Sequence, residues 1–495
     1  MIKNFNKILE NEETLDPANQ AEWLAMRQLG HNMVDEMFDY LQTTHERPVW
    51  QPITEGVISE FKKPLPSEPQ AVENIHAEFT KNILPYNKGN VSPRFWSWVE
   101  GGGTPLGMLA DMLASGMNPN VTIGDHAAMY VDTQVIEWSK EMFGFSKSAT
   151  GMLLSGGSLA NITGIMVARN AFQEKMRENG LQNMEKSMVL YTSTETHSCV
   201  QKAAEACGLG SNAVRKIGVD SDYRMKIGDL KQQIEADKAA GFAPFCIVGN
   251  AGTVNTGAID PLDEILEICK TENLWFHVDG AFGASAKLVD EYKDALKAIE
   301  EADSLAFDFH KWFYVNYEVG CILIKNPEKH RNAFVMQPKY LLAHERGLAG
   351  GPDPVTHYGM ELSRGFKALK VWMSLKEHGI EKYSRLIRQN IAQAFYLEDL
   401  VSKTPQLEML APVTMNIVCF RFNPQNVESE ALNAINKEIL MQLHEQGIAA
   451  PSYTILNGCY AIRCAITNHR SRKSDFEALV KGVLEIGEGL MMNDK

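Results

Sequence analysis

Two apolar segments, each followed by a charged residue, constrain this chain more than any other feature of its sequence. Residues 274–278 read Leu-Trp-Phe-His-Val and are followed by Asp279. Residues 304–309 read Ser-Leu-Ala-Phe-Asp-Phe, and Lys311 follows two positions later. Short apolar runs of this kind predict buried strands. In open α/β sheets, ligands bind outside the carboxyl ends of the strands. We therefore predict that Asp279 and Lys311 lie together at a ligand site.

The chemistry of this pair narrows the choice of ligand. An ammonium at the end of a buried strand is costly to desolvate, so we expect the pKa of Lys311 to fall toward the free amine. A free amine attacks carbonyl groups and forms Schiff bases. The plainer alternatives are a lysine whose ammonium reaches solvent and, for Asp279, a helix N-cap. Taken together, the amine and the carboxylate favour pyridoxal phosphate (PLP), which needs a lysine at one end and an anion beside its ring nitrogen.

The segments Asp279-Gly-Ala281 and Asp308-Phe-His-Lys311-Trp resemble the group II PLP-dependent amino-acid decarboxylases, the relatives of aromatic L-amino-acid decarboxylase. Further matching stretches extend from about Gly30 to Arg470. The resemblance implies an α/β fold of the PLP-dependent transferase type I (aspartate-aminotransferase-like) class, with a mostly parallel central sheet. Strand and helix patterns that alternate along the chain favour the same sheet with right-handed crossovers. We predict an N-terminal helical arm (1–90), a large PLP-binding domain (91–385) and a small C-terminal α/β domain (386–495).

Composition excludes several classes of protein. The net charge of −14 argues against a nucleic-acid binder, which needs a basic face. No run approaches the roughly 18 apolar residues of a membrane span. The eight cysteines show no metal-ligand spacing and predict buried free thiols, with no metal site. The N-terminus leads into acidic residues rather than an apolar signal core, so we expect a cytoplasmic protein. The resemblance implies a homodimer whose active site lies at the subunit interface; the alternative for the N-terminal arm is a helical cap on its own chain.

Periodicity predicts several elements with defined ends. The first helix runs through Trp23 and Leu41, with a start at Asp16-Pro17 and an end before Arg47-Pro48. Other helices are expected over 106–115, 129–143, 159–172, 364–370, 386–400 and 429–446. Strands are expected at 188–191, 245–248, 320–324, 417–422 and 460–466.

Ser155-Gly-Gly-Ser158 opens the helix expected over 159–172. Glycines leave backbone N–H groups accessible, and a helix N-terminus favours an anion, so this turn suits a phosphate. An ordinary turn with an N-cap is the alternative. The turn is in register with the phosphate loop of the resembling family, which implies that Gly156, Gly157 and Ser158 bind the PLP phosphate.

The resemblance assigns roles to further residues. It implies that His197 stacks on the PLP ring and helps to position the substrate, and that Asp279 keeps the ring nitrogen protonated. It places Thr253 and Ala281 in the cofactor site and His310 on its phosphate side. The family often has asparagine at the position of Asp308. Because a carboxylate near a phosphate is unfavourable, we expect His310, and not Asp308, to contact the phosphate.

Glycines and prolines in 336–357 predict an irregular loop. It matches the family's catalytic loop, whose tyrosine is proposed to protonate the substrate carbon after CO2 leaves. An ungapped alignment from Leu362-Ser-Arg364 places that tyrosine near Val355, and the nearest candidate is Tyr358. Either a gap restores the match or the proton comes from another group.

The predicted reaction is α-decarboxylation of an L-amino acid to the amine and CO2. The aromatic cluster Phe95, Trp96 and Trp98 favours an aromatic substrate, although such a cluster also suits the edge of a core. Arg94 keeps an acidic substrate open, and Ser363 matches a position that tunes ring size in relatives. Because the loop tyrosine is displaced, an aldehyde synthase of the same family is the main alternative. A PLP transaminase or lyase, and a non-enzymatic protein, are more distant ones.

Overall fold

The computed structural model describes residues 13–493, except for 174, 183, 337–343, 345 and 425–426. Part of the irregular loop predicted over 336–357 therefore lies outside the described residues. The chain divides into two compact units, Met1–Lys88 and Gly89–Lys495. The three-part division made from the sequence, with its boundary at residue 385, stays a prediction.

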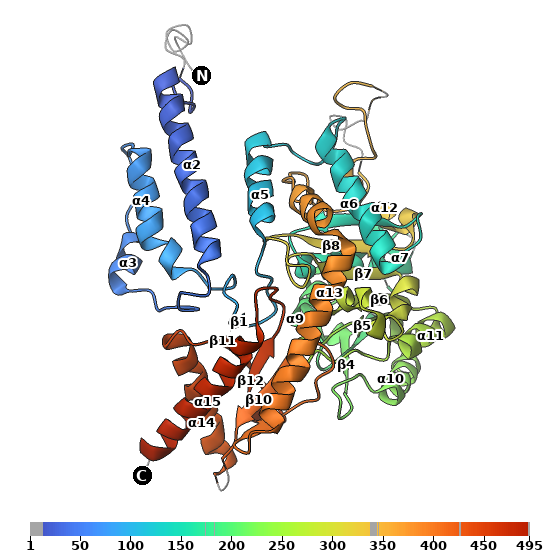
Figure 1. The fold of residues 1–495 in the computed structure, drawn as a ribbon. Helices are drawn as coiled ribbons and strands as arrows, with labels where there is room; N and C mark the ends of the chain where they lie inside the picture. Colours follow the sequence, from blue (N-terminus) through green and yellow to red (C-terminus); the bar gives the residue numbers. More distant parts are fainter. Residues whose placement is uncertain are drawn as a thin grey trace. The chain divides into compact units, whose positions relative to one another are not determined.

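The first unit is helical and contains α2 (Gln20–Gln42), α3 (Glu55–Glu60), α4 (Val72–Asn82) and the 3-10 turn η1 (Leu84–Tyr86) (Figure 1). Helix α2 begins at Gln20 because the side chain of Asn19 accepts hydrogen bonds from the N–H groups of Ala21 and Glu22. The start predicted at Asp16-Pro17 is thus wrong: a side-chain cap, rather than a proline, determines where the helix begins.

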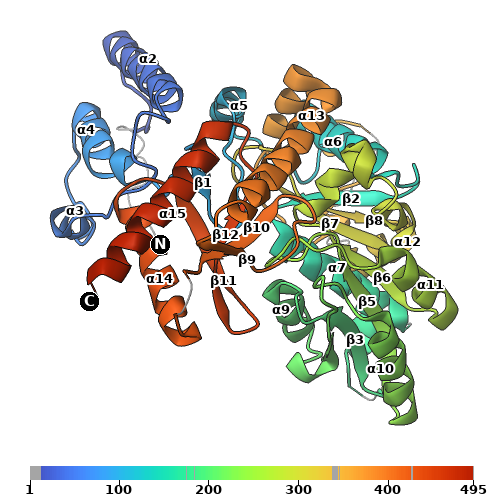
Figure 2. The same ribbon diagram turned by 60° about the horizontal axis from the view of Figure 1, so that its bottom comes forward.

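A seven-stranded sheet forms the centre of the second unit (Figure 2). Its order is β2-β8-β7-β6-β5-β3-β4, with β4, β3, β5, β6 and β7 parallel and β8 antiparallel to both of its neighbours. This arrangement confirms the mostly parallel sheet of the predicted fold class. The strands are β2 (Thr150–Leu154), β3 (Met188–Ser193), β4 (Val214–Ile217), β5 (Ala243–Asn250), β6 (Trp275–Asp279), β7 (Ser304–Asp308) and β8 (Gly320–Ile324).

Helices cover both faces of this sheet, which is why its strands read as nearly continuous apolar runs. Alternate residues of a strand point to opposite faces. In β8, Cys321 and Leu323 join the core formed with α6 (Ala127–Phe143), α10 (Ile227–Ala239) and α11 (Leu262–Glu272). Ile322 and Ile324 join the core formed with α7 (Gly157–Phe172), α9 (Ser198–Ala206) and α12 (Pro327–Phe334). The result is a three-layer α/β/α arrangement that leaves the strand ends as the place for a site.

A second, five-stranded sheet has the order β1-β11-β12-β10-β9. The two-residue strand β1 (Phe95–Trp96) pairs in parallel with β11 (Ala450–Leu456), so an early segment joins the C-terminal strands. The other members are β9 (Leu407–Met409), β10 (Ile417–Phe422) and β12 (Cys459–Ala465). Their core is shared with α13 (Ala368–Ser402), α14 (Ser429–Glu445) and α15 (Lys473–Asn493). Helix α5 (Pro105–Met117) follows β1 in the sequence and precedes α6.

The helix predicted over 364–370 begins only at Ala368. Arg364 lies before it in irregular structure, where the buried guanidinium donates to the carbonyl oxygens of Val121 (2.6 Å) and Leu153 (3.0 Å). Tertiary hydrogen bonds therefore override the local helical pattern. Helix α13 also contains the non-helical residue Gly379 (φ 65°, ψ 153°), which divides it into two segments.

The eight cysteines, all within the described part of the chain, are free thiols, and seven of them are buried. None of the helices in the described ranges combines the length and the apolar composition that a membrane span requires.

Candidate active site

The carboxyl ends of the parallel strands open into a cavity of about 360 Å³. Asn250 ends β5, Asp279 ends β6, and Lys311 follows β7 by three residues. His197 caps α9, and Gly157 begins α7. All of these residues line the cavity, as the rule for open α/β sheets requires. The remaining lining residues are Trp98, Val99, Glu100, Ser158, Asn161, Cys199, Gly252, Val254, Asn255, Ala281, Phe282, Tyr317, Ser452, Tyr453 and Arg463.

Lys311 and Asp279 thus lie in one cavity, as the sequence predicts, but the expected direction of the lysine pKa is wrong. Burial lowers the pKa of Lys311, yet the carboxylates of Asp308 and Asp279 more than offset burial, and the pKa lies above its ordinary value. The Lys311 Nζ atom is 2.8 Å from Asp308 Oδ2. The sequence argument counted desolvation alone, because the direction in which the Asp308 side chain points is a tertiary property.

Close backbone packing also positions Lys311. The Gly101 N–H donates to the carbonyl oxygen of His310 at 3.1 Å. A Cβ atom at Gly101 would lie 2.5 Å from the carbonyl oxygen of Lys311, which is too close for any other residue. The first of the three consecutive glycines at 101–103 is therefore required for this segment to lie against the lysine.

The carboxylate of Asp279 is held from two sides. Its Oδ1 accepts a hydrogen bond from the Ala281 N–H at 3.1 Å, and its Oδ2 faces the Cys199 thiol at 3.9 Å. Burial raises the pKa of that thiol, so it remains a weak donor rather than a thiolate. Asp279 therefore presents a fixed anion at the wall of the cavity.

His197 lines the same cavity. Its Nδ1 accepts a hydrogen bond from the N–H of Cys199 at 3.2 Å, which makes His197 the cap of α9. Burial lowers its pKa, with an opposing contribution from Asp279, so the imidazole is neutral near pH 7. A neutral ring can lie flat against an electron-poor heterocycle without adding a charge. The same side chain therefore caps α9 and lines the cavity.

The turn Ser155-Gly-Gly-Ser158 forms the N-terminus of α7, and no described side chain caps that helix. Gly157 and Ser158 line the cavity, whereas Gly156 lies just outside its lining. A Cβ atom at Gly157 would come within 2.8 Å of Asp308 Oδ2. The glycine thus lets the helix N-terminus approach the end of β7, where an anion would be stabilised by the helix dipole.

Besides Gly156, three predicted residues do not line the cavity. Thr253 is buried in its loop, where its Oγ1 accepts from the Ala258 N–H at 3.1 Å. His310 is buried beside the site, and its Nδ1 accepts from the Val319 N–H at 3.1 Å. Tyr358 donates its hydroxyl proton to Asp353 Oδ2 at 2.8 Å. The roles of these three residues stay predictions.

The aromatic cluster separates into two environments. Phe95 and Trp96 are buried, and Trp96 stacks on Phe476 with ring centroids 4.7 Å apart, so both belong to the core. Only Trp98 lines the cavity. Neither Arg94 nor Ser363, the other candidates for substrate selection, is among the lining residues.

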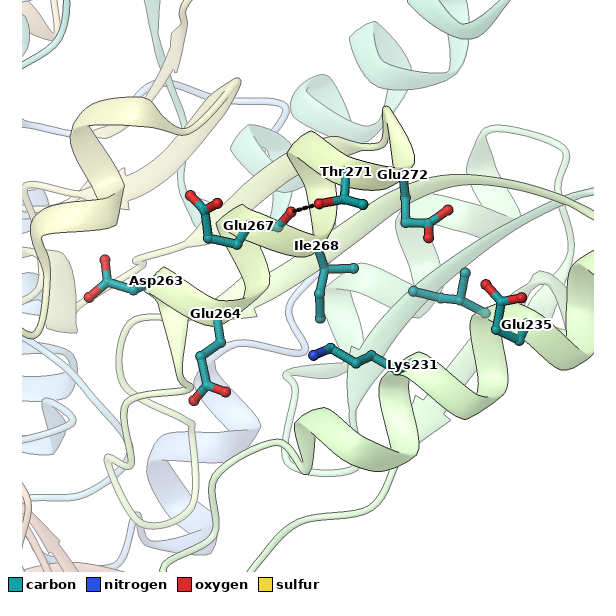
Figure 3. Close-up of a pocket in the computed structure, with 9 residues that line it drawn as sticks. Lys231, Glu235, Asp263, Glu264, Glu267, Ile268, Thr271 and Glu272 are labelled. Carbon is teal, nitrogen blue, oxygen red and sulfur yellow. Dashed lines mark hydrogen bonds between the residues drawn. The ribbon is translucent and has the colours of Figure 1, made fainter.

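A larger cavity of about 570 Å³ lies between α10 and α11 and has a different character. Figure 3 shows Lys231 and Glu235 on α10 facing a row of side chains from α11, among them Asp263, Glu264 and Glu267. This cavity lies between the outer helices α10 and α11 and not at the strand ends. We therefore place the active site in the smaller cavity, where an amine, a carboxylate and an imidazole converge.

Comparison with known proteins agrees with this choice. The model of the pyridoxal-dependent decarboxylase conserved domain matches residues 55–423. The chain belongs to the pyridoxal-dependent decarboxylase family. It is accordingly a PLP-dependent carboxy-lyase of the group II amino-acid decarboxylases, and its cofactor is pyridoxal 5'-phosphate.

Relatives of this decarboxylase match nearly its whole length. Aromatic-L-amino-acid decarboxylase of Bacillus atrophaeus is 33% identical and covers 94% of this chain and 95% of its own. Tyrosine decarboxylase 4 of Petroselinum crispum is 30% identical, with 91% of each chain covered. Phenylacetaldehyde synthase of Arabidopsis thaliana is 29% identical, covering 89% of this chain and 91% of its own.

Two solved structures share the fold. Oryza sativa TDC with PLP and tryptamine has a TM-score of 0.88 at 23% identity, covering 97% of this decarboxylase and 100% of its own chain. Catharanthus roseus tryptophan decarboxylase in complex with L-tryptophan has a TM-score of 0.85 at 26% identity, covering 96% and 100%. The predicted type I fold is thereby confirmed.

The residues of this decarboxylase fit PLP. One cavity offers an amine on Lys311, a carboxylate on Asp279 and the N-terminus of α7, which no described side chain caps, for a phosphate. These are the groups that the aldehyde, the ring nitrogen and the phosphate of PLP require.

Sequence reasoning missed several lining residues. Asn250 ends β5 exactly as Asp279 ends β6, so the rule that selected Asp279 also points to it. Its side-chain amide donates to Thr196 Oγ1 (2.8 Å) and Asp260 Oδ2 (2.6 Å). Arg463 and Tyr453 come from β12 and β11 of the other sheet, and no local pattern indicates that they reach the site.

Proposed function

We propose that this decarboxylase converts an aromatic L-amino acid to its amine and CO2 in the cavity that Lys311, Asp279 and His197 line. One observation supports this above all: an amine, a carboxylate and a neutral imidazole that follow or end the parallel strands β7, β6 and β3 line one cavity. The relatives named above for aromatic amino acids support the choice of substrate class.

The proposed roles follow from position. Bound PLP supplies the electron sink that decarboxylation needs. Lys311 provides the amine that binds the cofactor aldehyde, and Asp279 holds a proton on the ring nitrogen. His197, which lines the cavity, would pack on the cofactor and help to exclude water. Gly156, Gly157 and Ser158 bind the phosphate, with Thr253, Ala281 and His310 as supporting residues.

The walls of the cavity favour an aromatic side chain over an acidic one. Trp98, Phe282 and Tyr453 provide aromatic surface. The guanidinium of Arg463 is committed to its own chain: it donates to the carbonyl oxygens of Asn255 (2.9 Å) and Trp98 (2.9 Å) and to Ser452 Oγ (3.1 Å). Arg94 does not line the cavity. An acidic substrate would therefore lack a ready cationic partner among the described lining residues other than Lys311.

Tyr358 remains the proposed proton donor to the substrate carbon. Burial and the hydrogen bond to Asp353 raise its pKa to about 12, so the phenol retains its proton at neutral pH. In this structure the Tyr358 hydroxyl donates that proton to Asp353. Val355 lies in the 3-10 turn η7 (Val355–His357), which immediately precedes Tyr358. The loop would have to move for Tyr358 to act.

The displaced tyrosine supports an aldehyde synthase as the second candidate. That reaction couples decarboxylation to oxidative deamination by O2 and yields an aldehyde, ammonia and peroxide. A family relative of this chain is named phenylacetaldehyde synthase. Tyr358 would then not protonate the substrate carbon.

We further propose a cytoplasmic homodimer with its active site at the subunit interface. Helix α2 supports this assembly, because Leu29 is its only buried residue, whereas Trp23, Leu24, Met26, Met33 and Phe38 are exposed. An apolar surface of this kind is typical of an interface. Glu36, which binds His76 Nε2 at 2.7 Å, links α2 to α4 within the arm.

A product assay tests the proposed function. The PLP-loaded protein is supplied with each common L-amino acid, and amine, aldehyde, peroxide and CO2 are measured together. We expect amine and CO2 in equal amounts from an aromatic substrate. Aldehyde with peroxide would instead establish the synthase, and turnover of glutamate or aspartate alone would overturn the aromatic assignment.

A further inference from the structure

Asp308 ends β7 as a buried carboxylate beside Lys311. Its side chain is 1% exposed. Its Oδ2 lies 2.8 Å from Lys311 Nζ, and apart from this ion pair neither carboxylate oxygen has a hydrogen-bond partner among the described residues. The nearest other cationic candidate, His310 Nε2, is 3.9 Å away. Burial lowers the pKa of His310, so this imidazole is a neutral neighbour.

A buried carboxylate with no other partner depends on the charge of the one group that it contacts. An unpaired buried charge is strongly unfavourable, so Asp308 stabilises Lys311 in its ammonium form. Other titratable groups also face the pair: Asp279 from β6, His197 and Cys199 from the start of α9, His310 and Tyr317 from the loop after β7, and Cys321 from β8. Of these, Asp279 is the second carboxylate, but the Ala281 N–H already binds it.

We infer that Asp308 is a positioning residue that holds Lys311 as an ammonium whenever the lysine is not bonded to the cofactor, and that it thereby sets the pH at which Lys311 captures the cofactor aldehyde. Before capture, Nζ must release one proton to solvent. The free amine then forms a C=N bond to the aldehyde carbon, and the aldehyde oxygen leaves as water. No oxidation or reduction occurs. The inference rests on the proposed role of Lys311 as the cofactor-binding lysine.

The apoenzyme tests this inference without any amino-acid substrate. Capture of pyridoxal, which lacks the phosphate, is followed by absorbance from pH 6 to 10 for the wild type and for Asp308→Asn. Because pyridoxal has no phosphate, repulsion between Asp308 and a phosphate does not affect the comparison of the wild type with Asp308→Asn. A second series with PLP measures that repulsion. Asp294→Asn, at an exposed position, removes the same charge far from the site and serves as the matched control.

We expect the midpoint of the rate–pH curve to fall by at least one pH unit in Asp308→Asn, which corresponds to about tenfold faster capture at neutral pH. Asp294→Asn should match the wild type. An unchanged midpoint in a folded Asp308→Asn protein would overturn the inference. Lys311→Ala tests the proposed role of Lys311 separately from the inference about Asp308. If this variant still forms the C=N bond, the proposed role of Lys311 is wrong.

The wild-type protein alone gives a second test, which does not depend on how the variant folds. Its capture rate should keep rising with pH up to the ordinary lysine value of 10.5, in parallel with the rate of N-acetyl-lysine amide under the same conditions. A plateau near neutral pH would mean that the free amine is already available, and the inference would be wrong.

Discussion

Two aspartates end neighbouring parallel strands, and their surroundings give them different tasks. Asp279 ends β6 and Asp308 ends β7. Asp279 lines the cavity, with its oxygens facing the Ala281 N–H and the Cys199 thiol. Asp308 is outside the lining, and its Oδ2 lies 2.8 Å from Lys311 Nζ. The same residue type at equivalent strand ends thus faces the cavity in one case and a lysine in the other.

The two carboxylates therefore place negative charge at two separate points of the site. Under the proposed roles, Asp279 is available for a proton on the cofactor ring, and Asp308 compensates the charge of Lys311 when the lysine is not bonded to the cofactor. Both raise the pKa of Lys311, with Asp308 the stronger of the two. Substitutions at Lys311, Asp279, Asp308 and Cys199 test the difference between the two aspartates.

Removing Lys311 eliminates both the ion-pair partner of Asp308 and the amine proposed to bind the cofactor. In Lys311→Ala we expect kcat to fall by roughly a thousandfold or more, the upper range for the loss of a catalytic proton-transfer group. The measurement is amine formation under single-turnover conditions with added PLP. Activity within tenfold of the wild type would show that another group binds the cofactor.

Asp279→Asn removes the anion that faces the cavity and keeps its shape. A hydrogen bond to a charged group is worth about 1.5–3 kcal/mol, so we expect kcat to fall roughly tenfold to a hundredfold. Asp279→Glu should recover part of the loss, because it restores the carboxylate. Steady-state kinetics together with the absorption spectrum of the bound cofactor measure both variants. If Asp308→Asn loses more activity than Asp279→Asn, the division of tasks is wrong.

Asp308→Asn should change the pH dependence of stability in the apoprotein. Because the folded-state pKa of Lys311 is raised, its contribution is fully present below the ordinary value of 10.5 and is lost as pH rises through the higher folded pKa. At pH 8 the variant should be less stable, by less than the about 3–5 kcal/mol of a fully buried broken pair, since Nζ can reach the cavity. The difference should shrink above pH 10.5. Urea unfolding at pH 8 and pH 11 measures it; a constant difference would exclude the linkage.

Cys199→Ala tests the partner of Asp279 and should have the smallest effect. The contact from the Cys199 thiol to Asp279 is 3.9 Å long, and the Ala281 N–H continues to bind the carboxylate. We expect less than about a threefold change in kcat and in PLP affinity, because thiols are weak donors. Cys199→Ser, which offers a stronger donor, is the matched control. A larger loss in Cys199→Ala would mean that the thiol orients Asp279.

Much of the fold could be predicted from the chain itself. Apolar runs that precede Asp279 and Lys311 form β6 and β7, and the turn Ser155-Gly-Gly-Ser158 begins α7. Strand periodicity and turn residues are local properties, and parallel strands bring their carboxyl ends to one edge. The predicted start at Asp16-Pro17 was wrong because a competing cap at Asn19 lies close by in sequence.

The tertiary structure alone decided which side chains complete the site. Arg463 and Tyr453 reach the cavity from strands about 150 residues beyond Lys311, a contact that depends on how the two sheets pack. Packing also placed Trp96 in the core and left Trp98 at the cavity.

The sequence was enough to predict that Lys311 lies at the end of a buried strand, whereas the direction of its pKa shift depends on the tertiary structure. A buried strand fixes where the lysine lies, because its period and its apolar residues are encoded locally. The pKa depends on the distance between Nζ and the Asp308 carboxylate, since electrostatic energy varies with separation and with the surrounding medium. That distance exists only once β7, α7 and β8 are packed together.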